Sequence, residues 1–265
     1  MTASLGGSWA KFGRGHAQLI ALNNEILGFV QQNDPVRFVG KFNAEAKTHT
    51  ARAHILRHPD WRDWGLQLGD AIQNMRAALD HAVWQLVILS GDDPRKHRTQ
   101  FPICSTGTDY WCKTKDGRSS RRDRELVGVA EVYRAIIDDA QPYRARHPPK
   151  DHALSGLAYL SNTDKHRVIH AGFLTIGAPD AYIMDAVVSG DIDELIEAEV
   201  HSGPFQEDTD IVTLHFAVTG PKAHVEMEVE IPVDVAFSDR GYTVQQLFDV
   251  ADAVEFVLRD IDSAF

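Results

Sequence analysis

The sequence predicts an α+β protein: a helical N-terminal core with an inserted β-hairpin, followed by a mainly antiparallel sheet and a C-terminal helix. Apolar residues recur at helical spacing through much of the first 170 residues, and one segment near 36–57 alternates in polarity instead. After residue 170 the chain changes to β-branched runs separated by Gly, Pro and Asp, which is typical of short antiparallel strands. With 265 residues, the chain is long enough for one large domain or two modest ones.

Helices are expected wherever the apolar spacing persists between breakers. The first spans 8–32 and ends before the NDP turn. Pro59 is suited to open the second helix, which runs to about Ser90, where GDDP stops it. The remaining segments are expected to be a long loop around FPIC over 91–122 and helices over 125–140, 151–168 and 243–261.

Strands are expected in two places. Residues 36–57 alternate around a polar centre near Asn43, which predicts the hairpin. VEMEVEI at 225–231 places acidic and apolar residues on opposite faces of a strand. We therefore divide the chain into a helical region, 1–170, and an acidic β-sheet region with its closing helix, 171–265, which could also form one continuous domain.

The net charge of −11 is unevenly distributed along the chain. Residues 171–265 contain 20 acidic residues and three basic ones, a net of −17, so the first 170 residues have a net of +6. Basic residues cluster in RKHR, KTKDGRSSRRDR and YRARHPPK, at 95–98, 113–124 and 143–150. Such asymmetry indicates an anionic partner such as RNA for the basic part. The alternative is two solvated surfaces of an ordinary globular protein.

Several classes of protein are not expected. The first fifteen residues lack the apolar run of a secretion signal, and no stretch has the length of a membrane span, so we expect no membrane partner. The spacing of Cys104 and Cys112 matches no zinc or redox motif, which favours a reduced, cytoplasmic protein. Nucleotide-binding glycine motifs and the G-x-S-x-G hydrolase motif are absent, and we expect no cofactor.

The segment NMRAALDHAVWQL at 74–86 combines ionisable residues with aliphatic ones. It places Asn74, Arg76, Asp80 and His81 in a helix that also has a continuous apolar stripe. At about 100° per residue, Arg76 and His81 lie about 140° apart on a straight helix. One interpretation is structural, with an Arg76–Asp80 ion pair and a histidine whose ring nitrogens find partners.

MRAALDHAVW also resembles the R-x4–6-H signature of the HEPN superfamily, a group of helical nucleases. The resemblance implies a metal-independent endoribonuclease, such as a toxin or anti-phage effector, with a composite site often shared across a homodimer. It implies that Arg76 contacts the scissile phosphate and that His81 takes part in proton transfer at the ribose 2′-hydroxyl. Asn74 and Asp80 would contact substrate beside them. A guanidinium matches a phosphoryl group, and an imidazole titrates near neutral pH.

The segment SNTDKHRVIH at 161–170 is a second group of ionisable residues. One interpretation is a charged helix end with a solvated ion pair. GDAIQNMRAALDH followed later by DKHR also resembles a group of uncharacterised bacterial proteins, which implies that the two segments meet. Lys165 and Arg167 would then complete an anion site, and His166 would supply the acid that matches the base. Arg121 and Arg122, in the basic cluster at 113–124, are further candidates for RNA contacts.

Two alternatives to the nuclease remain open. His81, His166 and His170 form a candidate metal set that resembles DinB-like proteins, although our expectation is that no metal is bound. The other alternative is a non-enzymatic intracellular binding or scaffold module. Convergence of Arg76, His81, Lys165 and His166 in one cleft would favour the nuclease.

Overall fold

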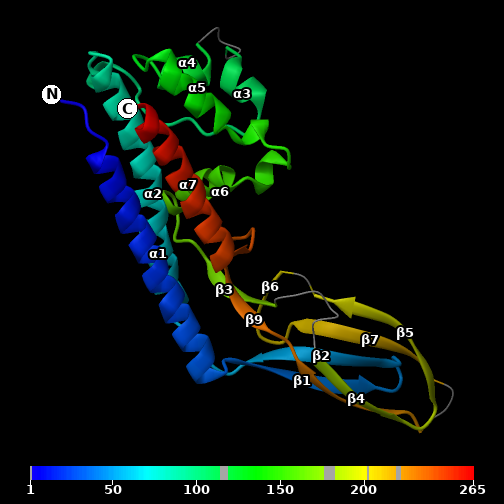
Figure 1. Cartoon of the computed structure of the whole chain (residues 1–265). Helices are drawn as coiled ribbons and strands as arrows, with labels where there is room; N and C mark the ends of the chain where they lie inside the picture. The colour runs from blue at the N-terminus through cyan, green and yellow to red at the C-terminus, as the bar shows by residue number, and fades with distance from the viewer. Residues whose placement is uncertain (1, 114–118, 176–182, 202, 219–221) are drawn as a thin grey trace. The chain divides into compact units, whose positions relative to one another are not determined.

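The computed structural model confirms the α+β class (Figure 1). Its described residues form seven α-helices and ten β-strands. The structure describes residues 2–113, 119–175, 183–201, 203–218 and 222–265, with only the backbone described at 183–188 and 226–230.

The predicted long helices are confirmed, and the region between them is more structured than expected. The expected loop over 91–122 contains a short 3₁₀ helix and the short helix α3. The helix expected over 125–140 is wrong at its start, because Gly128 adopts the left-handed conformation (φ +78°) and separates two helices. The helices are α1 (Gly6–Asn33), α2 (Trp61–Leu89), α3 (Gly107–Trp111), α4 (Arg121–Glu125), α5 (Glu131–Asp139), α6 (Ala153–Asp164) and α7 (Val244–Ala264).

All strand pairs are antiparallel, and they form three sheets among the described residues. The strand orders are β1-β2-β7-β5, β10-β9-β3-β6 and β4-β8. The strands are β1 (Val36–Asn43), β2 (Thr48–Ile55), β3 (Ala171–Thr175), β4 (Ile183–Ser189), β5 (Ile192–Val200), β6 (Pro204–Phe205), β7 (Asp210–Val218), β8 (His224–Glu230), β9 (Val233–Phe237) and β10 (Tyr242–Thr243).

The chain forms two compact units that differ from a linear division at residue 170. The hairpin groups with the sheets because β2 pairs with β7, which satisfies the backbone groups along one edge of the hairpin. The closing helix α7 groups with the helices, where it packs against α5 and α6. We call the units the helical unit (Met1–Asn23, Arg62–Ile169 and Val244–Phe265) and the β unit (Asn24–Trp61 and His170–Thr243).

Helix α2 forms the centre of the helical unit. Its predicted apolar stripe is confirmed, because Leu68, Ile72, Met75, Leu79 and Leu86 are at most 1% exposed. Such burial contributes about 1.5–3 kcal/mol for each large side chain. Helix α1 approaches α2 closely at Gly15, where an added Cβ would lie 2.8 Å from the Ala71 carbonyl oxygen.

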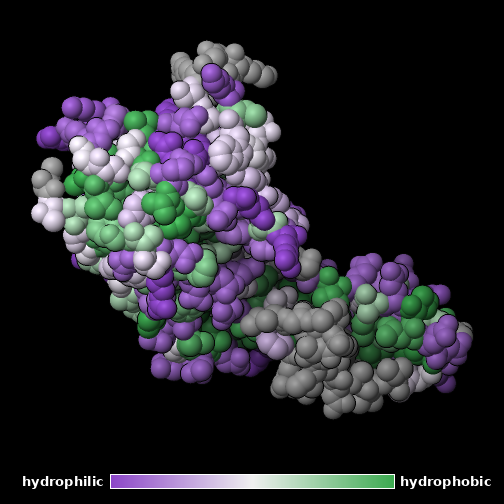
Figure 2. Space-filling model, turned by 45° about the horizontal axis from the view of Figure 1, so that its top comes forward, coloured by the Kyte–Doolittle hydropathy of each residue, from purple (hydrophilic) through white to green (hydrophobic). Residues whose placement is uncertain are grey.

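Other features of the described residues bear on expectations from the sequence. No described helix has the length and hydropathy needed to cross a membrane. Both cysteines are free thiols: Cys104 is buried and Cys112 exposed. Much of the visible surface is hydrophilic (Figure 2), in keeping with the 25% charged residues of the chain. The acidic face expected of 225–231 involves side chains outside the described ones.

The hairpin of the β unit has the expected polar turn. The side chain of Asn43 accepts hydrogen bonds from the backbone N–H groups of Glu45 and Ala46. Lys47 closes the turn in the left-handed conformation (φ +56°). Strand β2 continues from there, and its buried residues alternate from His49 onward.

His49 is an unusual member of this buried row. It is 2% exposed, and neither ring nitrogen has a hydrogen-bond partner among the described residues. Burial lowers the pKa of His49 below its ordinary value of 6.5, because the charged imidazolium loses its hydration. Neutral His49 is therefore the form that the folded β unit accommodates.

We predict that His49 makes the protein sensitive to mild acid. The unfolded chain takes up this proton near pH 6.5, whereas the folded chain does so only at lower pH, so stability falls as the pH drops below about 6.5. The thermal midpoint of the His49→Leu variant should therefore decrease less than that of the wild type between about pH 7.5 and about pH 5.5. One such group changes the free energy of unfolding by up to about 1.4 kcal/mol per pH unit. His166→Gln, which changes an exposed histidine, is the matched control. Equal slopes for wild type and His49→Leu would contradict the prediction.

Candidate functional site

Arg76 lies in a buried cluster that joins α2 to the segment after it. Its Nη2 donates to Asp80 Oδ1 at 2.9 Å and to the carbonyl oxygen of Phe101. The Phe101 N–H donates to the same Asp80 oxygen at 2.8 Å. Arg76 is only 9% exposed. The guanidinium is therefore already bonded to a carboxylate and a carbonyl, which is a structural role.

This cluster fixes the FPIC segment, which is buried but has no regular secondary structure. A buried irregular backbone needs side chains as hydrogen-bond partners. Gln141 supplies them at the other end of the segment, where its amide donates to the Pro102 carbonyl oxygen and accepts from the Cys104 N–H. Arg76, Asp80 and Gln141 thus replace the bonds that a strand or helix would have made.

His81 lies on another side of α2 and is exposed. It faces the start of α1, where a Cβ added to Gly7 would lie 3.7 Å from His81 Nδ1. Because α2 is continuous from Trp61 to Leu89, the separation of about 140° between Arg76 and His81 is kept. Asn74 also faces α1, where its amide donates to Gln18 at 2.8 Å.

The end of α6 meets α2, as the pairing of the two sequence segments implied. Asp164 Oδ2 accepts a hydrogen bond of 3.0 Å from Gln73, and an added Cβ at Gly69 would lie 2.0 Å from Asp164 Oδ1. A larger residue at position 69 would therefore have to displace the Asp164 carboxylate. The contact involves neither Arg76 nor His81. The next three residues along the chain are the predicted site residues Lys165, His166 and Arg167. All three are exposed.

The basic cluster at 113–124 is described at residue 113 and from residue 119 onward, and its described arginines pair with buried acids. Arg122 makes a bidentate pair with Asp138, with bonds of 2.8 and 2.9 Å. The hydrogen bonds to Asp138 raise the pKa of Arg122 above its ordinary value. Arg121 lies 3.1 Å from both oxygens of Glu125, whose side chain is fully buried. These arginines stabilise internal carboxylates, which leaves them less available to a phosphate.

The histidines proposed as a metal set do not form a cluster. Among the described residues, one group of three His, Cys, Asp or Glu side chains has all its ligand atoms within 4.8 Å of one another, and it does not contain His81, His166 or His170. His170 belongs to the β unit, whereas His81 and His166 belong to the helical unit.

The β unit contains a cavity of about 750 Å³. Three aromatic rings form its apolar wall: Trp61 packs edge-to-face on Phe173 at 4.8 Å, and Phe173 stacks on Phe205 at 5.9 Å. The polar lining includes the carboxylates of Glu207 and Asp239. Pockets of this size and mixture bind small molecules.

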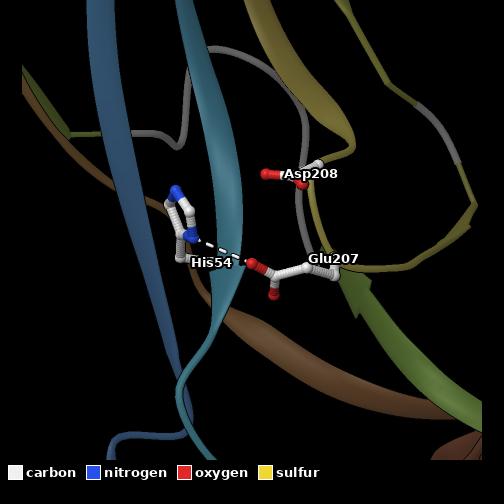
Figure 3. Close-up of side chains that lie close together, drawn as sticks. All are labelled: His54, Glu207 and Asp208. Carbon is white, nitrogen blue, oxygen red and sulfur yellow. Dashed lines mark hydrogen bonds and ion pairs between the residues drawn. The ribbon is translucent and has the colours of Figure 1, made fainter.

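Glu207 also belongs to the one close group of ligand atoms, together with His54 and Asp208 (Figure 3). In Figure 3 both carboxylates point from the turn between β6 and β7 toward the His54 ring on β2. His54 Nδ1 lies 2.8 Å from Glu207 Oε1, and the Ile55 N–H donates to Glu207 Oε2 at 2.6 Å. The Ile55 bond and then the His54 bond lower the pKa of Glu207, which is therefore ionised at neutral pH.

These β-unit residues were not predicted from the sequence. His54 and Glu207 are 153 positions apart, and neither lies in a metal or catalytic motif. Trp61 lies near the predicted start of the second helix. Nothing in the surrounding sequence indicates that its ring lines a pocket. Only the pairing of β2 with the start of β7 brings the two segments together.

No family model, curated protein or solved structure matches this chain. The HEPN and DinB resemblances therefore stay predictions.

We predict that Arg76 contributes to stability and that His81 does not. Arg76→Met should lower the free energy of unfolding by about 2–3 kcal/mol, because Asp80 and the Phe101 carbonyl would lose a buried charged donor. His81→Ala should change it by less than about 0.5 kcal/mol, because the side chain is exposed. Urea unfolding followed by circular dichroism measures both values. A stable Arg76→Met variant would show that the buried cluster has little structural importance.

Proposed function

We propose that this chain is a binding protein, and that its β unit binds a small ligand with an aromatic or apolar body and a positively charged group. The cavity of about 750 Å³ in that unit is the observation that supports the proposal. All the residues that line the cavity belong to one compact unit. A ligand cavity supports the non-enzymatic binding module rather than the nuclease.

The lining of the cavity favours an organic cation. Trp61 is the partly exposed ring of the lining and lies against Phe173, which is buried together with Phe205; aromatic faces also attract cations. Glu207 and Asp239 add two carboxylates at the same cavity. His58 and His170 also belong to the polar lining beside these carboxylates. An anionic ligand would be repelled there.

We predict that tryptamine binds to this cavity and that indole-3-acetate binds more weakly. The two probes share an indole ring and differ in the sign of their charge. Saturation-transfer NMR on the full chain should show stronger transfer to tryptamine. Trp61→Ala should weaken its affinity about tenfold, as the loss of one aromatic and cation–π contact implies. Asp239→Asn should reduce the preference for the amine.

Trp84→Ala is the matched control, since Trp84 is a partly exposed tryptophan of the helical unit. Its tryptamine signal should equal that of the wild type. The proposal fails if the two probes give equal transfer in the wild type, or if Trp61→Ala and Trp84→Ala behave alike.

RNA cleavage is a second proposal, supported by the exposure of His81 and of the cationic residue Lys165. A HEPN-like enzyme of this kind would act as a homodimer on cytoplasmic RNA, as a toxin or anti-phage effector. It would require Arg76 to leave Asp80 and the Phe101 carbonyl, which is why the geometry favours the binding proposal.

For this second proposal we predict that the wild-type protein cleaves a fluorescent RNA in the presence of a metal chelator and that His81→Ala abolishes this cleavage. The thermal midpoint of the variant should equal that of the wild type. Imidazole is the proton-transfer group of the proposed site, and its removal should cost at least about 100-fold in rate. His224→Ala, which changes an exposed histidine of the β unit, is the control. Intact RNA with the wild-type protein, or equal cleavage by His81→Ala, would refute the nuclease proposal.

A further inference from the structure

The turn between β6 and β7 and the end of β2 bring together three side chains with metal-binding chemistry. His54 comes from β2, and Glu207 and Asp208 come from the turn. One ligand atom of each lies within 4.8 Å of the other two. We propose that these three residues bind a divalent transition-metal ion of the zinc type.

The donor set suits such an ion in kind and in charge. Imidazole nitrogen and carboxylate oxygen are both ligands of Zn²⁺, at about 2.0–2.2 Å from the metal. Two carboxylates neutralise the two positive charges of the ion, and one imidazole adds a neutral donor. Three protein ligands leave a fourth position of a tetrahedron for water.

The observed spacing is close to the one a metal requires. Two ligands of a tetrahedral ion lie about 3.3–3.6 Å apart when each is about 2.0–2.2 Å from the metal. His54 Nδ1 and Glu207 Oε1 now share a hydrogen bond of 2.8 Å, and the metal would take the place of its proton. Small side-chain rotations separate these two atoms and bring Asp208 closer.

The backbone around the three ligands is already fixed. Glu207 keeps a hydrogen bond from the Ile55 N–H through its second oxygen, which orients the carboxylate. The Asp208 N–H donates to the Ala53 carbonyl oxygen at 2.9 Å, and the Ala53 N–H donates to the Thr209 carbonyl oxygen at 2.9 Å. The turn therefore holds Asp208 beside β2 without help from an ion.

The neighbouring charges permit a cation. Arg52 on β2 interacts electrostatically with Asp208, but its hydrogen-bonded partner is Asp210, at 2.6 Å. His58 lies close enough to Glu207 to help lower the pKa of that carboxyl. Glu207 also lines the aromatic cavity, so a bound ion would lie at the border of that cavity. The metal proposal does not depend on the organic ligand proposed for the cavity.

Calorimetric titration of the untagged full chain with zinc chloride, after removal of metals by chelator, tests the proposal. We expect one ion per chain at about pH 7.5. His54→Gln and Asp208→Asn should each weaken the binding at least about tenfold. Asparagine tolerates the left-handed conformation of Asp208 (φ +61°), so this variant keeps the turn.

His97→Gln is the matched control. His97 Nε2 lies 2.9 Å from Asp92, so it forms a similar histidine–carboxylate pair, without a third ligand among the described residues. Zinc affinity should be unchanged in this variant. The proposal is overturned if the wild type binds no stoichiometric zinc, or if His54→Gln, with an unchanged circular dichroism spectrum, binds zinc as tightly as the wild type.

Discussion

The pairing of β2 with β7 is the constraint on which the sites of the β unit depend. It joins two segments more than 150 positions apart, and it attaches a hairpin from the first quarter of the chain to strands from the last third. The closure of such a long loop has an entropic cost, which increases only slowly with length. Once the ladder is formed, the residues at its end have fixed neighbours. His54 then faces Glu207, and Ile55 lies beside the same turn.

Arg76 shows how a catalytic signature can serve packing. An arginine and a histidine five positions apart resemble a nuclease motif in sequence, but a straight helix directs them to different neighbours. The arginine and Asp80 satisfy the backbone of a buried irregular segment. His81 lies on another side of α2, where it faces the start of α1. Deleting the charge of Arg76 would leave polar groups unsatisfied in the core, which is a strong reason for an arginine at this position. The motif therefore has a structural explanation that does not require RNA.

The sequence predicted the fold class and the long helices because their signals are local. The apolar stripe of α2 from Leu68 to Leu86 and the turn chemistry at Asn43 follow from neighbouring residues alone. Gly128 was missed as a helix break, since a single glycine is compatible with a helix until its backbone angle is known. The grouping of α7 with the helices was missed because it depends on which apolar face meets which.

The candidate site was much harder to predict. Asp80 was correctly placed as a partner of Arg76, because the two are one helical turn apart. The internal partners of Arg121 and Arg122 were missed, although Glu125 and Asp138 lie only a few residues away. Clustered arginines look like a phosphate-binding surface unless the burial of nearby acids is known. The cavity around Trp61 depends on four separate segments, and no local pattern encodes that arrangement.

The charge asymmetry of the chain has a different meaning once the pairing of arginines is considered. The excess of basic residues before residue 170 suggested an anionic partner, yet several of those arginines neutralise buried carboxylates. The acidic excess after residue 170 includes Glu207, Asp208 and Asp239, which lie at the cavity or in the His54 cluster. The side chains of all three are exposed, so water and salt screen their attraction for a cation, and it acts mainly at contact distance. The chemistry of the β unit therefore favours cationic partners, whether a metal ion or an organic amine.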